Sequence, residues 1–324
     1  MELPPRSHIC FPVPLTRAQM QVTHKSEFNR RRASSDLEDR ADEIWNRRIS
    51  ENPHLFNGTK FRYAGLCVAA GRVLSEGGLR IVLPAEGKLS VNLRAGFGSY
   101  KEYLSTNLAG LAEELAKYGA DKYQDSQACM GDIVGHSALL LTADNYVVIQ
   151  LRSQLVGEAA GMWHFPGGHP EPEEMGIGSA GDLARADPAK VVEEIYASVL
   201  REMKEELNMT EELMSEPRLL CLGKDKSTSY KPELNFLLHT PLLAHQLSDR
   251  YHAEGFQDDE SDDIGFWDLA ELKVEGRASF QLNKFKSRDS EVVSVSRELL
   301  ANSSLQLINS LPTLLQHNPQ LFNL

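Results

Sequence analysis

Apolar residues recur along the chain with two different periods, which predict an alternation of strands and helices. Segments rich in Val, Leu and Ile and bounded by turn-forming residues predict strands at 61–74, 79–95, 136–142, 146–151, 219–222 and 234–238. Apolar residues at helical spacing predict helices at 35–50, 100–118, 240–251 and 294–309, with Gly119 as the stop of the second. Strands alternating with helices in this way predict an α/β fold with helices on both faces of a sheet.

A further helix is predicted between Asp187 and Asn208. Asp187 followed by Pro188 is an N-cap with proline in the first helical position, and Asn208 tolerates the left-handed conformation common just past a helix end. An apolar stripe centres on Val192, Val199, Met203 and Leu207. This stripe can face a core while another face of the helix remains available for chemistry.

That other face is acidic. Glu202 and Glu206 lie one turn apart, with Glu205 beside them and Arg201 next to Glu202. Three carboxylates within two turns are typical of a divalent-metal site, but glutamate-rich helices also occur as solvated surface. These residues alone leave both interpretations open.

Composition and charge narrow the class of protein. With 324 residues and 41% apolar residues the chain can bury a substantial core, and no run approaches the ~18 apolar residues of a membrane span. The net charge of −12 disfavours non-specific binding to nucleic acid. Four scattered cysteines, without metal or pairing logic, are typical of reduced thiols in a cytosolic protein.

The segment upstream of the acidic helix reads Phe165-Pro-Gly-Gly-His-Pro-Glu-Pro172. Together, the two segments resemble the signature of the Nudix hydrolases, G-x5-E-x7-R-E-U-x-E-E-x-G-U with U apolar. Gly168 matches the opening glycine, Glu193 precedes Arg201 with seven residues between, and residues 201–206 fill the R-E-U-x-E-E core. Two departures are Asn208 in place of the late glycine and residues 173–188, which look like an inserted loop.

Three more segments make the resemblance narrower. Residues 55–62, residues 94–108 and the Gly167–Pro172 turn look, in this order, like the uridine diphosphate glucose pyrophosphatase branch of the family and its plant relatives. The resemblance implies a Nudix-type α/β/α sandwich with a mixed sheet and an N-terminal α+β module packed on it. We accordingly expect a partly ordered arm at 1–33, a substrate-recognition module at 34–125 and a Nudix domain at 126–318.

The resemblance also implies a site. Glu202 and Glu206 are the expected ligands of Mg²⁺, with Mn²⁺ as a substitute ion, while Glu205 would act nearby and Arg201 would support the acids by reaching Glu205. The implied substrate-binding residues are Phe56, Tyr100, Arg152, Gly157, His164, His169 and Glu171, of which Phe56 and Tyr100 would form the platform for base and ribose. The acidic run 258–263 either supplies a general base or is a solvated loop.

The expected reaction is Mg²⁺-dependent hydrolysis of UDP-glucose, with UDP-galactose as a second candidate, to UMP and hexose 1-phosphate. The expected partner is thus a small nucleotide sugar, without nucleic acid or membrane. Alternatives are hydrolysis of ADP-ribose or coenzyme A, or a catalytically silent domain that only binds a nucleotide. Base and sugar stay open because aromatic stacking accepts any nucleobase.

Overall fold

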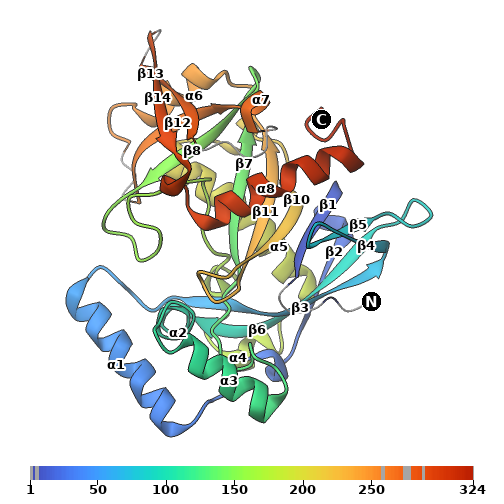
Figure 1. Cartoon of the computed structure of the whole chain (residues 1–324), viewed down its shortest axis with the longest axis vertical. Coiled ribbons are helices and arrows are strands. Elements are labelled where there is room, and N and C mark those ends of the chain that lie inside the picture. The colour runs from blue at the N-terminus through green and yellow to red at the C-terminus, as the bar shows by residue number, and fades with distance from the viewer. Residues whose placement is uncertain (1–2, 4–6, 257–259, 273–278, 287–288, 324) are drawn as a thin grey trace.

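The computed structural model describes residues 3, 7–256, 260–272, 279–286 and 289–323. Its strands form a large sheet and a small sheet (Figure 1). In spatial order the large sheet contains β14 (Asp289–Ser296), β13 (Ser279–Lys286), β12 (Ser261–Asp268), β8 (Tyr146–Arg152), β7 (Gly135–Leu141), β11 (Lys231–His239), β10 (Arg218–Asp225), β1 (His8–Leu15), β5 (Leu79–Leu83) and β4 (Arg72–Glu76), and β9 (Trp163–His164) pairs with β8. The small sheet contains β2 (Met20–His24), β6 (Ser90–Ser99) and β3 (Thr59–Ala70).

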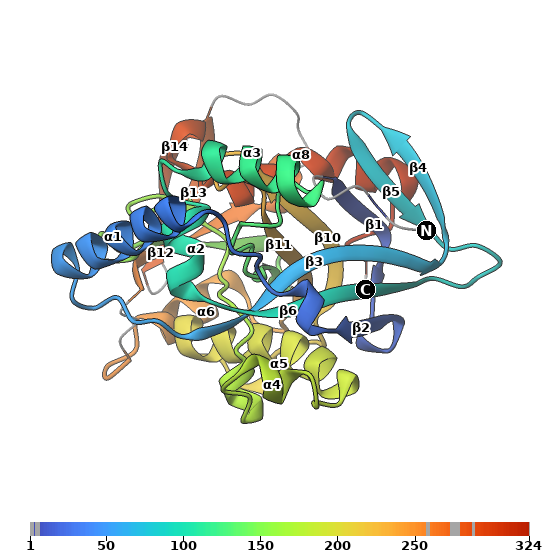
Figure 2. The same ribbon diagram turned by 90° about the horizontal axis from the view of Figure 1, so that it is seen from below.

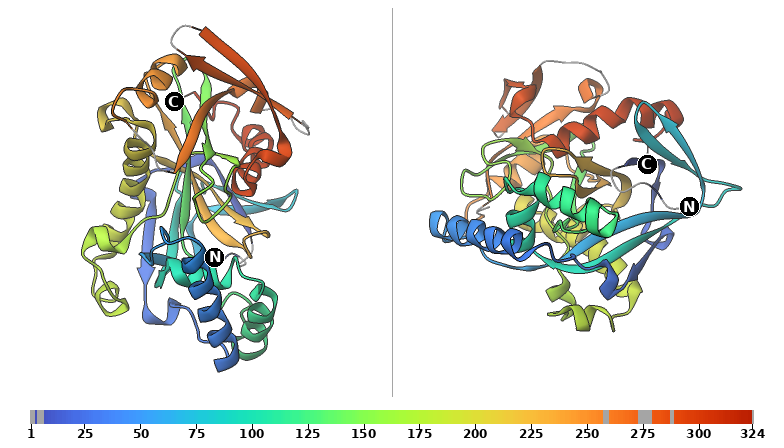
Figure 3. Two further views of the ribbon diagram at one scale, coloured as in Figure 1. Left: turned by 90° about the vertical axis from the view of Figure 1, so that its left-hand side faces the viewer. Right: turned by 60° about the horizontal axis from the view of Figure 1, so that its bottom comes forward.

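Helices cover both faces of the large sheet (Figure 3, left). The helices are α1 (Ser35–Glu51), α2 (Tyr100–Thr106), α3 (Ala112–Tyr123), α4 (Ala180–Leu183), α5 (Pro188–Leu207), α6 (Ala244–Tyr251), α7 (Leu269–Leu272) and α8 (Asn302–His317). In β11, Leu234, Phe236 and Leu238 share a core with the apolar stripe of α5, whereas Leu237 shares a second core with α8. This period of two follows from the alternation of side chains across a strand. With parallel pairs β7–β11 and β1–β5 among antiparallel ones, the expected α/β sandwich with a mixed sheet is confirmed.

The small sheet extends the α5 core. Val22 of β2 and Val91 and Leu93 of β6 join the cluster that α5 buries. Figure 2, seen from below, shows the small sheet between α3 and the pair α4 and α5. The expected boundary between residues 125 and 126 stays a prediction, and strands from both sides of it share the large sheet.

Residues 8–24 differ from the expected partly ordered arm, because they form β1 and β2. β1 lies between β10 and β5 in the large sheet, with an almost fully buried sequence. The sequence does not predict this strand because it contains Pro12 and Pro14, and proline cannot donate a backbone hydrogen bond to a neighbouring strand. The pairing with β10 accordingly skips from Cys10 to Leu15.

Five other expectations need correction. The strand expected at 61–74 divides at Gly71 into β3 and β4, and that expected at 79–95 divides into β5 and β6. The helix expected at 100–118 divides into α2 and α3, and Gly119 lies inside α3, where a Cβ would approach the carbonyl oxygen of Asp125 to 2.6 Å. The helix expected at 294–309 is shifted to α8, after β14. The insertion 173–188 contains α4 and buries Ile177 and Leu183.

The predicted ends of α5 and the predicted turn between β7 and β8 are confirmed. α5 begins after Asp187, whose side chain accepts from the backbone N–H of Ala189, and ends at Asn208 in the left-handed conformation. Asn145, also left-handed, turns β7 into β8.

All four cysteines are unpaired. No helix in the described part of the chain is both long and apolar enough to cross a membrane.

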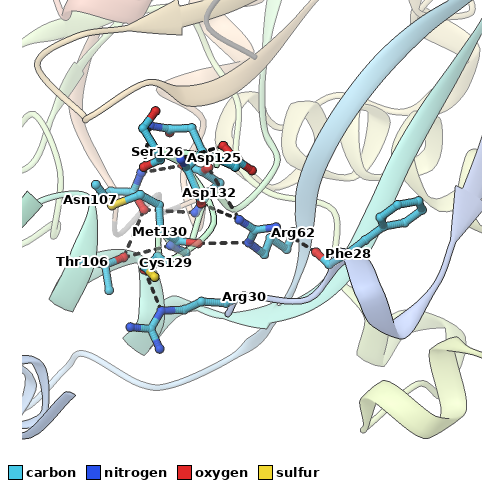
Figure 4. Close-up of polar contacts among 12 residues, drawn as sticks. Phe28, Arg30, Arg62, Thr106, Asn107, Asp125, Ser126, Cys129, Met130 and Asp132 are labelled. Atoms are coloured by element: carbon cyan, nitrogen blue, oxygen red, sulfur yellow. Dashed lines mark hydrogen bonds and ion pairs between the residues drawn. The ribbon is translucent and has the colours of Figure 1, made fainter. Parts of the chain in front are cut away.

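Arg62 of β3 fixes the segment that leads into β7 (Figure 4). Its guanidinium donates to three backbone carbonyl oxygens, those of Gln127 (2.7 Å), Phe28 (2.8 Å) and Met130 (3.0 Å). Asp132 in the same segment accepts from the side chain of Asn107 at 2.8 Å. Hydrogen bonds of this kind, made by buried charged groups, hold a loop rigidly. β7 therefore enters the large sheet from a fixed position next to the small sheet.

Candidate functional site

A cavity of about 690 Å³ opens between the loop after α1, the start of α2, and the β7–β8–β11 part of the large sheet. Eight of the residues expected to form the site line it: Phe56, Tyr100, Arg152, Gly157, His164, His169, Glu171 and Glu202. Arg201, Glu205 and Glu206 do not line it. The structure therefore brings residues from very distant parts of the sequence to one cavity.

The glycine turn packs its backbone directly on the acidic helix. A Cβ at Gly168 would lie 1.9 Å from Oε1 of Glu202, and a Cβ at Gly167 would lie 2.2 Å from the backbone oxygen of His136. The turn is tied to β7 because the backbone N–H of His136 donates to the oxygen of Gly168 at 2.9 Å. Only glycine fits these positions without displacing the carboxylate or the strand.

The three acids of α5 occupy different environments. Glu202 points to the cavity, and its burial, with the charges of Glu260 and Glu205, raises its pKa to about 8. Glu206 is buried below the turn and accepts from the N–H of Gly167 at 3.0 Å. Glu205 is exposed beside them. A carboxylate such as Glu202, removed from water among other acids, is stabilised in its ionised form by a nearby cation.

Arg201 does not reach Glu205, which corrects the expected contact. Its guanidinium instead lies 2.6 Å from Oε1 of Glu194 and 3.8 Å from Glu174 in the insertion. Glu194 is 5% exposed and also accepts from the N–H of Glu171 at 2.9 Å. Glu194, held by Arg201, thus connects α5 to the backbone of Glu171, three residues after Gly168.

Glu193, which the strict spacing selected, is exposed. α5 starts at Pro188, so both glutamates lie on the same continuous helix as Arg201. Glu194 is seven positions before Arg201, almost two full turns of the helix, and therefore lies on the same face. Glu193 is eight positions before Arg201 and points about 80° away. Helix geometry therefore selects Glu194 as the partner of Arg201.

The mouth of the cavity is aromatic. Phe56 is 71% exposed there, and Tyr100 is half-buried with its pKa raised by burial. The ring of Tyr100 contacts that of His169 edge-on, with centroids 6.2 Å apart. A Cβ at Gly157 would lie 2.7 Å from the Tyr100 hydroxyl, so the glycine allows this loop to pack against the ring. A planar ligand can therefore reach two aromatic side chains at the entrance.

Arg152 and Lys60 also line the cavity. Arg152 donates from Nε to the backbone oxygen of Glu158 at 2.9 Å and lies 3.8 Å from Glu260. Lys60 of β3, which is buried, forms an ion pair with the partly exposed Glu171. Burial and the nearby charge of Arg152 lower the pKa of His164 well below its usual value, so this imidazole is neutral. The cavity thus combines fixed positive charge with the carboxylates.

Known proteins are similar to this chain over most of its length. No protein-family model matches the chain. The human protein named uridine diphosphate glucose pyrophosphatase NUDT22 is 31% identical over 223 residues, which cover 69% of this chain and 69% of the human protein. The chain belongs to the Nudix hydrolase family. The bovine protein of the same name is 34% identical to this Nudix hydrolase, over 69% of this chain and 72% of the bovine protein. Nudix hydrolase 9 of Arabidopsis thaliana is 29% identical, over 81% of this chain and 82% of the plant protein.

Sequence reasoning missed several polar residues of this Nudix hydrolase that line the cavity: Lys60, His136, Glu158, Lys231 and Glu233. Glu260 also lines it and belongs to the acidic run for which the sequence left a general base or a solvated loop open. Asp258 and Asp259 of that run lie outside the described residues, and its last three residues begin β12. The sequence could have indicated Lys231 and Glu233, because two charged residues two positions apart in an apolar strand lie on the same face of the sheet. The others depend on contacts between distant segments.

His136 is the most deeply buried of these residues. It is 1% exposed, and both ring nitrogens lack a hydrogen-bond partner among the described residues. Burial, followed by the charges of Arg201, Lys231 and Lys60, lowers its pKa to about 3. This Nudix hydrolase therefore places a neutral imidazole at the floor of its cavity.

Proposed function

We propose that the chain hydrolyses the diphosphate linkage of UDP-glucose, and also of UDP-galactose, to UMP and hexose 1-phosphate in a Mg²⁺-dependent reaction. The observation that carries this proposal is the single cavity that joins the aromatic mouth at Phe56 and Tyr100 to the carboxylate of Glu202. Relatives named uridine diphosphate glucose pyrophosphatase, 31% and 34% identical to this chain, support the choice of a uridine nucleotide sugar.

The donor set fits Mg²⁺. Glu202 and Glu206 offer carboxylate oxygens, the hard ligands that this ion prefers, and Mg²⁺ usually keeps several waters beside one or two carboxylates. No group of three or more His, Cys, Asp or Glu side chains arranged to hold a metal occurs within the described ranges. The raised pKa of Glu202 also marks a carboxylate that a cation would stabilise. When bound, Mg²⁺ or Mn²⁺ would neutralise phosphoryl charge and lower the pKa of a water molecule.

The other site residues bind and orient the substrate. Phe56 and Tyr100 stack on the base and ribose. Arg152 and Lys60 bring positive charge toward the phosphates, which guanidinium groups bind well. His169 and Glu171 follow the glycine turn and orient the substrate, with Gly157 and His164 shaping its surroundings. Arg201 and Glu205 act from outside the cavity. Arg201 holds Glu194 in an ion pair, and the charge of Glu205 raises the pKa of Glu202.

A small anionic nucleotide sugar is compatible with the net charge of −12 because local cations and a metal dominate the field inside a cavity. We also propose a cytoplasmic location, which the four unpaired cysteines support.

The experiment that tests the proposal is turnover of a substrate panel by purified protein with Mg²⁺. The panel contains UDP-glucose, UDP-galactose, ADP-ribose and coenzyme A, and the release of UMP and hexose 1-phosphate is followed by chromatography. Glu202→Gln and addition of a chelator serve as matched controls, because both remove the metal without altering the aromatic mouth. We expect turnover of the UDP-sugars that both controls abolish.

Two outcomes would contradict this function. Turnover of ADP-ribose or coenzyme A without turnover of UDP-sugars would refute the uridine assignment. Nucleotide binding without turnover under any divalent ion would instead identify a silent binding domain.

A further inference from the structure

A buried lysine lies between two glutamates in the wall of the cavity. Nζ of Lys231 is 3.0 Å from Oε2 of Glu158 and 3.6 Å from Oε2 of Glu233. Lys231 and Glu233 share one face of β11, and Glu158 comes from the loop after β8. All three line the cavity, and the proposed hydrolysis uses none of them. We call these three residues the Lys231 triad.

The Lys231 triad lies at the aromatic end of the cavity. Nζ of Lys231 is 5.0 Å from the centre of the Tyr103 ring, whose centroid is 6.0 Å from that of Tyr100. Glu158 directly follows Gly157, the residue that packs against the Tyr100 hydroxyl. A planar ligand that stacks on Tyr100 therefore brings its polar edge toward the triad.

The fold makes room for these charges. A Cβ at Gly135 would lie 2.3 Å from Oε2 of Glu233 and 3.1 Å from Nζ of Lys231. Removing three charged groups from water has a large desolvation cost, and such clusters rarely stabilise a fold more than apolar residues of the same size. The arrangement is better explained by recognition of a polar ligand than by stability.

The charges of the triad match the polar edge of uracil and distinguish it from that of cytosine. Uracil presents an N3–H donor between two carbonyl acceptors, whereas cytosine presents an acceptor at N3 and an amino group at position 4. An ammonium beside a carboxylate offers a donor and an acceptor, which complement a uracil carbonyl and N3–H. Cytosine would place its N3 acceptor against the carboxylate.

We propose that Lys231 and Glu158 select uracil, with Lys231 donating to a ring carbonyl oxygen and Glu158 accepting from N3–H, while Glu233 holds Lys231 in place. This inference rests on the proposed function only in that the nucleotide occupies the same cavity. It adds the base selectivity that stacking on Phe56 and Tyr100 cannot provide.

The protonation states of Glu158 and Lys231 agree with these roles, while burial raises the pKa of Glu233 to about 7. Burial opposes the ionised form of Glu158, but the charge and hydrogen bond of Lys231 outweigh it and lower the pKa of this carboxyl. Burial likewise opposes the charged form of Lys231, and the two glutamates outweigh it and raise the pKa of the ammonium. At neutral pH the acceptor and the donor are therefore both ionised.

The test measures binding of UMP and CMP by calorimetry, which does not require turnover. We expect the wild-type protein to bind UMP about 10-fold to 100-fold more tightly than CMP, the range of one charge-assisted hydrogen bond. Glu158→Gln keeps the size of the side chain but adds an amide donor that can serve N3 of cytosine, so the preference for UMP should fall by about tenfold. Lys231→Met should weaken UMP binding by about tenfold.

Lys117→Met is the matched control, because Lys117 is an exposed lysine on α3 far from the cavity lining. It should leave both affinities unchanged. Circular dichroism establishes whether each variant folds, and the isosteric Glu158→Gln decides the question if Lys231→Met does not fold.

An unchanged UMP/CMP ratio in folded Glu158→Gln, or no preference for UMP in the wild type, would overturn the inference. A change in the UDP-glucose/UDP-galactose ratio without a change in the UMP/CMP ratio would overturn it too, since the triad would then contact the hexose. If the wild type turns over no UDP-sugar but the variants lose the UMP preference, the inference stands and the proposed function fails.

Discussion

Substituting Glu194 by glutamine tests whether helix geometry or the strict family spacing identifies the partner of Arg201. Glu194 accepts from Arg201 at 2.6 Å and from the N–H of Glu171 at 2.9 Å, and it is 5% exposed. Glutamine can keep the bond to the N–H of Glu171 but loses the charge that Arg201 binds. A hydrogen bond between charged groups contributes about 1.5–3 kcal/mol, and the partly exposed Arg201 can recover some of this from water. We therefore expect the free energy of unfolding to fall by about 1–3 kcal/mol.

The assay is urea unfolding, combined with kinetics on the substrate that the panel identifies. Because Glu194 also fixes the backbone of Glu171 beside the glycine turn, kcat/KM should fall by about 10-fold to 100-fold. Glu193→Gln is the matched control: it is the adjacent, exposed residue that the strict spacing selected, and it should change stability by less than about 0.5 kcal/mol. A larger loss of stability in Glu193→Gln than in Glu194→Gln would refute the reasoning.

Three further predictions concern the cavity. Phe56→Ala should raise KM for the nucleotide sugar with little change in metal dependence, since Phe56 only lines the mouth; an unchanged KM would remove it from the site. Gly168→Ala should lower kcat by at least about 10-fold while the protein stays folded, because the new Cβ would displace the Glu202 carboxylate, and wild-type kcat would disprove this. His136, with a pKa of about 3 in the fold, takes up a proton in the unfolded state first as pH falls. Unfolding measured in chelator should therefore lose up to about 1.4 kcal/mol of stability per pH unit from about pH 6 to pH 4, and equal slopes for wild type and His136→Gln would contradict this.

Local signals predicted much of the fold. The N-cap Asp187, the proline after it and Asn208 bounded α5 because caps act within one turn. Residues 136–151 predicted the β7–β8 hairpin because alternation and a turn lie in one short segment. The cavity-lining residues that resemblance implied were also brought together, from Phe56 to Glu202.

What the sequence did not predict depends on distant partners. β1 contains two prolines and becomes a strand only because β10 and β5 flank it. Glu194 and not Glu193 pairs with Arg201 because all three lie on one continuous helix and only Glu194 shares a face with Arg201. The Lys231 triad joins residues 158, 231 and 233, and no spacing rule connects a loop with a strand more than 70 positions away.

The position of β1 has a consequence for synthesis of the chain. β1 is made before both of its neighbours in the large sheet, since β5 ends at Leu83 and β10 ends at Asp225. Until β10 is made, one edge of this apolar strand has no partner, and an unpaired edge is a template for pairing with other chains. We therefore expect co-translational chaperone capture to concentrate on nascent chains in which residues 8–15 have been made and the β10 segment has not.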